Sequence, residues 1–504
     1  MGKSLFRAVV LVAGFSVLTR FFGFIFRIYL SRELGAELLG VYQVAFSVFM
    51  VLVVLVSSGI PLAISKLTAS YRVSNNTRAE NAVTTSALII GLIVALVLCA
   101  VILIFQNLIG GLFADERCMY ILITLLPAVI ASAVYSAFRG SLWGSRNYFS
   151  VCWTEFAEQI IRIIAFVIMA NFLFVGLDGA SLAGWSMSIA CILSATLVVI
   201  VYVKNGKKLS SPKGYFKPVL SSAVPVTGVR TASSLIQPVI AVLFPAMLVL
   251  AGYSSEQAME SYGMAMGMTF PLLFLPSTVV GALSFTLIPE LSTAIAKNEN
   301  DTIANRIKTS LLFAVFISAM VVPFYIGAGE QIGLFLYDNA SSGIYLARAA
   351  WVMLPLGLSN ITSSVLNAYN LEVKSFLNNI LGGVLLLGIV AGFSGLMGVD
   401  ALIWGFGACM TITTILNLVM LKRHTKLKFG LVKPTLMMLA FTIPCALLGK
   451  FAYPLLSFVF PDFLTIALVA CFSCGSFALL CWLFKLIDLT SVVVKLKPKR
   501  TKKA

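Results

Sequence analysis

Long apolar runs alternate with short polar or charged breaks along almost the whole chain. Each run is about as long as a helix that crosses a bilayer, which needs about 20 mostly apolar residues. The runs fall near residues 5–30, 41–65, 82–108, 119–140, 151–175, 179–203, 219–251, 261–288, 309–328, 343–368, 375–396, 399–421, 434–455 and 463–487. This pattern predicts an all-α polytopic membrane protein with about fourteen transmembrane helices.

The composition agrees with this prediction. Of the 504 residues, 60% are apolar and 11% are charged, whereas soluble proteins are about 45–50% apolar and about 25% charged. The nine cysteines are scattered through apolar runs, which is not the pattern of a disulfide framework. Because His424 is the only histidine, a histidine-based metal or proton site is not expected. We expect no metal and no cofactor.

The charges are distributed unevenly between alternate loops. The chain has 36 basic and 19 acidic side chains, a net charge of +17. If the N-terminus is cytoplasmic, basic residues gather in the inner loops and in the C-terminal tail, and the outer loops are mainly acidic. Arg32, Arg117 and Lys450 are the few basic residues outside. Since basic loops stay in the cytoplasm, both termini are predicted to be cytoplasmic. The excess charge therefore does not indicate a nucleic-acid partner.

An internal repeat indicates two lobes. Residues 126–150 align without a gap with residues 354–378, so that Leu126-Pro127 matches Leu354-Pro355. The repeat unit is six helices, and an even number gives both halves the same orientation, related by a pseudo-two-fold axis along the membrane normal. The predicted organisation is an N-terminal lobe (1–203), a basic cytoplasmic linker (204–218), a C-terminal lobe (219–421), and two extra helices with a basic cytoplasmic tail (422–504).

Several arginines fall inside predicted helices. A charged side chain at the centre of a bilayer costs about 2.5–3.5 kcal/mol on insertion scales, so it needs a reason. Arg20 and Arg27 are seven residues apart and share one face of the first helix. They are candidates for a cationic stripe that faces a cavity and binds a pyrophosphate; the alternative is snorkelling to the interface. Arg230 lies near the start of the seventh helix, the repeat counterpart of the first. It is a candidate for the same cavity or an anchor at the inner interface.

The fifth helix carries acidic and basic residues near its start. Glu158 and Arg162 are one turn apart and can pair with each other, and Glu155 precedes them by one turn. Two interpretations stay open. The charges form a self-neutralised structural pair, or a carboxylate takes up a proton or sodium ion or balances the arginines.

Prolines cluster in the seventh and eighth helices. They are Pro225, Pro238, Pro245, Pro271, Pro276 and Pro289. Because proline removes a backbone donor and bends a helix, the cluster indicates hinges or gates, for which Pro225, Pro238, Pro276 and Pro289 are the candidates. The alternative is that membrane helices simply tolerate proline.

The N-terminal sequence carries a family resemblance. Residues 14–43 read GFSVLTRFFGFIFRIYLSRELGAELLGVYQ, and residues 57–67 read SSGIPLAISKL. Both stretches resemble the stage V sporulation protein B group of the polysaccharide transporter (oligosaccharide flippase) family. This family belongs to the multidrug/oligosaccharidyl-lipid/polysaccharide exporter superfamily. Further similar motifs are Arg139-Gly140, Glu158-Gln159-Ile-Ile-Arg162, Pro225-Val-Thr-Gly228 and Leu287-Ile-Pro289-Glu290. The resemblance covers essentially the whole chain.

This resemblance implies two six-helix lobes around a central cavity, alternating access, and export of a lipid-linked oligosaccharide of the undecaprenyl-pyrophosphate type across the bacterial cytoplasmic membrane. It implies that Arg20 and Arg27 contact the pyrophosphate, with Arg230 and Arg162 as further candidates. The expected partners are the lipid-linked substrate and membrane lipids, and we expect a monomeric transporter rather than an enzyme.

Alternatives of other kinds stay open. One is a cation-coupled multidrug extruder of the same superfamily, although cationic drugs would favour acidic rather than basic residues in the helices. Another is a membrane glycosyltransferase or polymerase, which would need acidic motifs or a large catalytic loop. The sequence contains no nucleotide-binding motif. Coupling to the membrane potential, to protons or to sodium ions remains open, as do the saccharide and the pathway served.

Overall fold

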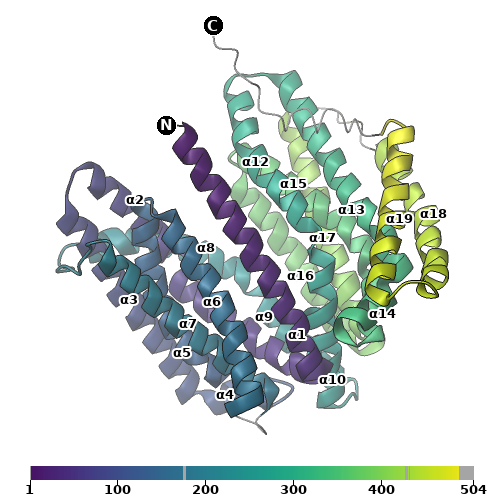
Figure 1. Ribbon diagram of the computed structural model, residues 1–504. Helices are drawn as coiled ribbons and strands as arrows, with labels where there is room; N and C mark the ends of the chain where they lie inside the picture. Colours follow the sequence, from purple (N-terminus) through teal and green to yellow (C-terminus); the bar gives the residue numbers. More distant parts are fainter. Residues whose placement is uncertain (1, 174–177, 426–429, 431, 487–504) are drawn as a thin grey trace. The chain divides into compact units, whose positions relative to one another are not determined.

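A computed structural model describes residues 2–173, 178–425, 430 and 432–486. Within these ranges the chain is helical and has no strand, as predicted (Figure 1). The elements in chain order are α1 (Gly2–Ser57), α2 (Ile60–Val73), α3 (Thr77–Ile104), α4 (Gln106–Gly110), α5 (Arg117–Gly144), α6 (Tyr148–Ile168), η1 (Met169–Leu173), α7 (Gly179–Lys204), α8 (Phe216–Ser234), α9 (Ile236–Leu250), α10 (Ser255–Tyr262), η2 (Gly263–Thr269), α11 (Phe270–Phe274), α12 (Ser277–Ala296), α13 (Asn300–Tyr337), α14 (Ala340–Ala349), η3 (Ala350–Val352), α15 (Met353–Ala368), α16 (Glu372–Met397), α17 (Val399–Thr425), α18 (Val432–Ser457) and α19 (Asp462–Leu483).

Twelve helical segments of the described chain are long and apolar enough to cross a membrane. This number is smaller than the predicted number of about fourteen, for two physical reasons. Leu11–Val73 forms a single segment of 63 residues, about three times the length that one crossing needs. Helix α6 is not among the twelve, and it carries the three charged residues Glu155, Glu158 and Arg162.

Where an outer loop was expected between the first two apolar runs, the structure has a kink at a single residue, Gly35. Helix α1 continues through this region with Gly35 as its only non-helical residue, at φ 70° and ψ 179°. Glycine adopts positive φ without steric cost, whereas a Cβ there would be strained. A single residue therefore redirects the chain between residues 2–34 and 36–57.

The chain packs into two compact units, Met1–Gly267 and Met268–Ala504. This division does not coincide with the linker at 204–218, because α8, α9 and α10 pack against α1 and its neighbours in the first unit. The lobes inferred from the repeat remain a prediction. The basic tail beyond residue 486 lies outside the described residues.

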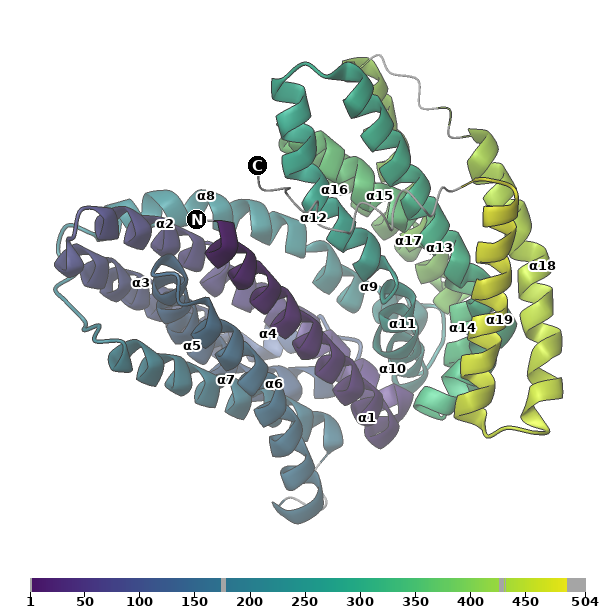
Figure 2. The ribbon, with the colours of Figure 1, turned by 45° about the horizontal axis from the view of Figure 1, so that its top comes forward.

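Helix α5 lies at the centre of the first unit. It packs against α1, α2, α3 and α7, and α3, α5 and α7 run side by side (Figure 2). Its last turns approach α2 closely, since a Cβ on Gly144 would lie 2.7 Å from the carbonyl oxygen of Ser65. Small residues thus let the helix backbones approach, as is usual between membrane helices.

A second close crossing joins α1 to the segment formed by α10 and η2. A Cβ on Gly40 would lie 1.9 Å from the carbonyl oxygen of Met259, and one on Gly263 would lie 1.8 Å from that of Ala36. No side chain fits at either position, so the two backbones are in direct contact.

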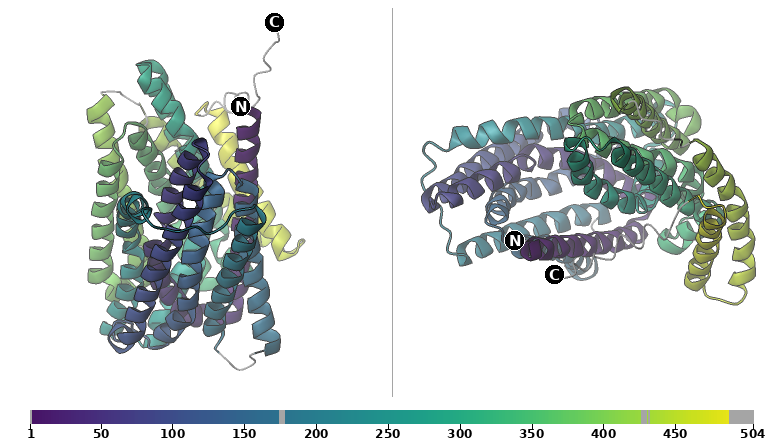
Figure 3. Two further views of the ribbon diagram at one scale, coloured as in Figure 1. Left: turned by 90° about the vertical axis from the view of Figure 1, so that its left-hand side faces the viewer. Right: turned by 90° about the horizontal axis from the view of Figure 1, so that it is seen from above.

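Helix α13 is the central helix of the second unit. It packs against α14, α15, α18 and α19, while α16 pairs with α17 and α12 with α15. The α18–α19 pair, yellow-green to yellow, lies at one edge of this unit (Figure 3). These are the two extra C-terminal helices that the sequence predicted.

The predicted eighth span, residues 261–288, is interrupted rather than continuous. It is built from the end of α10, the π-helical turn η2, the short α11, and α12, which begins after Pro276 as its N-cap residue. Pro225 and Pro289 instead lie inside the uninterrupted helices α8 and α12, and Pro238 lies in the first turn of α9, just after the α8–α9 boundary at Leu235.

Candidate functional site

An aromatic seam holds the first half of α1 against α6. Phe22 packs on Phe156 with ring centroids 5.6 Å apart, and Phe26 packs on Phe166 at 5.7 Å, both edge to face. Such pairs are favourable beyond the area they bury. The seam sets the register between the two helices that carry most of the candidate charges.

Arg20 and Arg27 lie on a different face of α1, about 100–160° around the helix from Phe22 and Phe26 by helical geometry. Arg20 is exposed and Arg27 is half-buried. The phenol of Tyr42, 5% exposed, interacts electrostatically with both Arg27 and Arg162. The structure therefore places Arg27 and Arg162, which come from different helices, near one common group.

Arg162 reaches from α6 towards α1 and α7. Its guanidinium lies over the ring of Phe26, 5.1 Å from the centroid, and its Nη2 donates to Gln159 Oε1 at 2.6 Å. Its Nη1 contacts the sulfur of Met187 at 3.4 Å. The contact with an aromatic face and the neutral amide compensate partly for placing a guanidinium in an apolar region.

Two buried donors at this point have no hydrogen-bond partner among the described residues. They are Nε of Arg162 and Nε2 of Gln159. The Gln159 amide lies against α1, because a Cβ on Gly23 would be 3.6 Å from its Nε2. Buried donors in proteins are nearly always paired, so these two nitrogens call for an acceptor that the described residues do not supply, such as a buried water or an anion.

The glutamates of α6 have different partners. Glu155 forms an ion pair with Arg139 of α5 at 2.5 Å. Glu158 lies beside Ser194 of α7 and interacts electrostatically with Arg162. The ion pairs of the described residues do not include Glu158 with Arg162, so the self-neutralised pair, one of the two interpretations left open, has no direct salt bridge here. The reason is that the Arg162 side chain turns towards Phe26 and Gln159 instead.

Arg230 of α8 has a different environment. It is exposed, and its Nη1 donates to the carbonyl of Ser58 at 3.2 Å, at the break between α1 and α2. Helix α8 lies close to this break, since a Cβ on Gly59 would be 2.3 Å from the carbonyl oxygen of Ala223. A cation at the C-terminal end of α1 also complements the helix dipole.

The second unit contains a buried polar cluster of neutral side chains. Asn378 Nδ2 donates to Asn417 Oδ1 at 2.9 Å, and Asn417 Nδ2 donates to Ser363 Oγ at 3.1 Å. Asn417 is fully buried, and Asn378 is 8% exposed. These bonds join α15, α16 and α17, which is a usual role for amides between membrane helices.

A charged cluster lies near the beginning of α5. Arg117 Nη2 contacts Glu37 Oε1 at 2.6 Å and Asp115 Oδ2 at 2.7 Å, and Ser255 Oγ donates to the carbonyl of Ala114 at 2.7 Å. Burial alone would raise the pKa of Asp115, but the hydrogen bonds from Arg117 outweigh it and the pKa is lowered. This pairing explains why Arg117 is tolerated in a region predicted to face outwards.

Two cavities lie apart from the candidate arginines. One of about 710 Å3 lies between α4 and the start of α5 and is lined by Asn107, Glu116 and Tyr120 among others. The other, of about 430 Å3, lies between α12 and α13, beside the ion pair of Arg306 with Glu290. Neither is lined by Arg20, Arg27, Arg162 or Arg230.

Sequence reasoning did not select Gln159, Phe26 or Tyr42 as site residues. Gln159 stands inside the Glu-Gln-Ile-Ile-Arg motif, which was a usable signal. Phe26 and Tyr42 give no such signal, because an aromatic residue in an apolar run is ordinary. Their relation to Arg162 depends on helix packing.

Comparison with solved structures assigns the fold. A lipid II flippase MurJ in an inward closed conformation superposes with a TM-score of 0.69 at 16% identity, covering 95% of this chain and 100% of that one. An inward-facing multidrug resistance MATE family transporter of the MOP superfamily superposes with a TM-score of 0.65 at 15% identity, covering 81% and 94%. The chain thus shares the all-helical, multi-pass fold of these transporters.

The family follows from sequence comparison. The model of the family described as polysaccharide biosynthesis protein matches residues 5–294, more than half of the chain. The protein belongs to this family. It is also 24% identical over 403 residues to stage V sporulation protein B of Bacillus subtilis (strain 168), covering 77% of this chain and 78% of that protein. The resemblance read from the N-terminal motifs is confirmed.

Proposed function

We propose that this protein is a flippase that moves a lipid-linked oligosaccharide of the undecaprenyl-pyrophosphate type across the cytoplasmic membrane by alternating access. The pathway is synthesis of a cell-envelope or spore-cortex polysaccharide. The family and the similarity to a sporulation protein and a lipid II flippase support this class of substrate.

The observation that carries the proposal is the pair of unpartnered donors on Arg162 and Gln159, on the helix that packs against the first half of α1. A pyrophosphate offers several anionic acceptors, and a guanidinium binds them in a planar, forked geometry. We assign Arg162 and Gln159 to the substrate's pyrophosphate, together with Arg27 and Arg20. Arg230 is a secondary candidate, because its guanidinium already has a carbonyl partner.

The remaining candidate residues take supporting roles in the proposal. Glu158 is the candidate for ion coupling or charge balance, since Glu155 is engaged with Arg139. Pro225, Pro238, Pro276 and Pro289 are candidate hinges, and Pro276 is the one at which the helical path is interrupted. We place both termini in the cytoplasm on the distribution of basic loops.

The test is reconstitution of the full chain into vesicles that contain a fluorescently labelled undecaprenyl-pyrophosphate oligosaccharide. Accessibility of the sugar to a membrane-impermeant quencher then reports its leaflet. We expect the protein to accelerate exchange between leaflets and Arg162→Met to lose this activity. Arg348→Met is the matched control, because Arg348 pairs with Asp400 at 2.7 Å in the second unit, away from these residues in sequence.

Two results would contradict the proposal. Unchanged sugar exchange in Arg162→Met would exclude the assigned contact. Efflux of cationic dyes without any movement of the lipid-linked sugar would favour the multidrug extruder instead.

A further inference from the structure

The lysines of residues 204–218 fall into two groups. Lys204, Lys208, Lys213 and Lys217 are exposed, as expected for a basic segment in water. The side chain of Lys207 is only 13% exposed, although it is in the same segment. A buried ammonium needs compensating partners, and its surroundings supply them.

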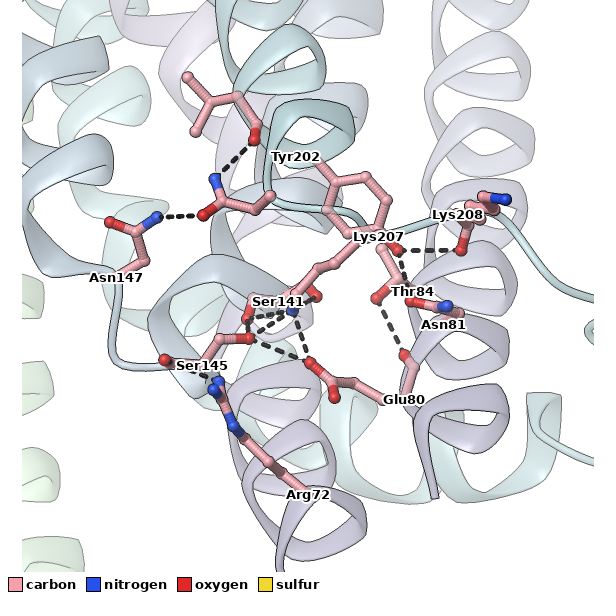
Figure 4. Close-up of polar contacts among 12 residues, drawn as sticks. Arg72, Glu80, Asn81, Thr84, Ser141, Ser145, Asn147, Tyr202, Lys207 and Lys208 are labelled. Atoms are coloured by element: carbon pink, nitrogen blue, oxygen red, sulfur yellow. Dashed lines mark hydrogen bonds and ion pairs between the residues drawn. The ribbon is translucent and has the colours of Figure 1, made fainter. Parts of the chain in front are cut away.

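The Lys207 ammonium is surrounded by acceptors from α3 and the end of α5 and by an aromatic ring of α7 (Figure 4). Its Nζ donates to Glu80 Oε1 of α3 at 2.6 Å, to Ser141 Oγ of α5 at 2.9 Å and to the hydroxyl of Ser145. The ring of Tyr202 from α7 adds a cation–π contact at 5.6 Å. An ammonium carries three protons, and this cage occupies all of them.

The partners of Lys207 are themselves held in place. Glu80 is buried, and its carboxylate also accepts from Ser145 Oγ at 3.0 Å. Arg72 of α2 donates to the carbonyl of Ser145 at 2.8 Å. The ends of α2, α3, α5 and α7 therefore converge on one buried ion pair, which Figure 4 shows.

Beyond Lys207, hydrogen bonds to α7 and α3 continue to hold the same segment in place. Tyr202 OH donates to the carbonyl of Lys208 at 3.3 Å, and the amide of Ser210 donates to Thr85 Oγ1 at 3.1 Å. Ser86 Oγ then donates to the carbonyl of Pro212 at 3.2 Å. Helix α8 begins at Phe216, directly after this fastened stretch.

We propose that Lys207 is a positioning residue that binds residues 205–215 to the rest of the first unit. This segment, called the strap below, then has a fixed backbone, and α8 starts from a fixed point. The connection between α7 and α8 is then not a flexible tether. The inference stands apart from the proposed function, because its test measures the backbone of the strap rather than transport.

The test is hydrogen–deuterium exchange with mass spectrometry on the full-length protein in lipid nanodiscs. Peptides covering 205–215 are expected to exchange slowly in the unaltered chain. Lys207→Met should make them exchange about tenfold faster or more, since it leaves Glu80 buried without its partner. Lys208→Met is the matched control and should leave exchange unchanged, because that side chain is exposed.

A double variant distinguishes a specific pair from general loosening. If Lys207 acts through Glu80, the exchange rate of Lys207→Met combined with Glu80→Gln will be no greater than that of Lys207→Met alone. Peptides of α16 and α17 serve as the internal reference for an intact fold. Three results would overturn the proposal. They are an exchange rate in Lys207→Met equal to that of the unaltered chain, an acceleration by Lys208→Met equal to that by Lys207→Met, and effects of the two substitutions that multiply in the double variant.

Discussion

The guanidinium of Arg162 lies over the ring of Phe26, 5.1 Å from its centroid, and so joins a charge on α6 to the aromatic seam of α1. Within the part of the chain that the structure describes, neither Nε of Arg162 nor Nε2 of Gln159 has an acceptor. A side chain held in this way presents its free donor in a fixed direction, which lowers the entropy cost of binding an anion.

Arg162→Lys tests whether geometry matters beyond charge. Lysine keeps the charge but cannot hold the planar fork, so we expect the apparent KM for the lipid-linked substrate to rise about tenfold with a smaller change in maximal rate. The vesicle assay at several substrate densities measures both. Phe26→Leu should give a weaker shift in the same direction, and a larger effect from Phe26→Leu than from Arg162→Lys would argue for packing alone.

Arg20→Ala and Arg27→Ala test the α1 stripe. A charge-assisted hydrogen bond contributes about 1.5–3 kcal/mol, so each loss should slow sugar exchange by about tenfold or more. Surface-level immunoblots and size-exclusion profiles check that both variants insert and stay monodisperse. Normal exchange in both would remove α1 from the proposed pyrophosphate site.

Glu158→Gln tests ion coupling. If Glu158 takes up the coupling ion, the variant should keep basal exchange but lose its stimulation by an imposed proton or sodium gradient. Glu155→Gln is the comparison, because Glu155 is paired with Arg139 and should affect thermal stability rather than coupling. A gradient response that survives in Glu158→Gln would leave the membrane potential or another group as the driving element.

Gly40→Val tests the contact between α1 and α10. A Cβ at this position would lie 1.9 Å from a carbonyl oxygen, so the helices must separate. Overpacking of this kind should lower the midpoint of thermal unfolding by about 5 °C or more. Gly14→Val is the control, because nothing lies within 4 Å of a Cβ there, and an equal loss in both variants would deny the crossing a special role.

Asp115→Asn tests the charged cluster at the start of α5. The pKa of Asp115 is lowered in the folded protein, so its carboxylate contributes stability above the unfolded pKa of about 3.9 and loses it as the pH falls through the folded pKa. Thermal midpoints of the unaltered chain should therefore fall below about pH 4 more steeply than those of Asp115→Asn. The exposed neighbour Glu116, replaced by glutamine, should leave that slope unchanged.

The helices could be predicted from sequence because a bilayer requires apolar runs of fixed minimum length. The break at Gly35 could not be told from a loop, since polar residues such as Arg32 and Glu33 surround it. The face shared by Arg20 and Arg27 follows from helical spacing alone. The pairing of Glu155 with Arg139, and of Lys207 with Glu80, joins different elements and depends on packing that no local pattern encodes.

Gly35 also separates two differently packed parts of α1. Residues 36–57 are largely buried, whereas the earlier half leaves Val17 and Phe21 more than half exposed. Arg20 lies 15 residues from Gly35, a lever arm of about 22 Å. A rotation of about 10° about Gly35 therefore displaces Arg20 by about 4 Å without melting any helix. Because the aromatic seam joins this half of α1 to α6, such a rotation would carry α6, and with it Arg162, along with the arginines of α1.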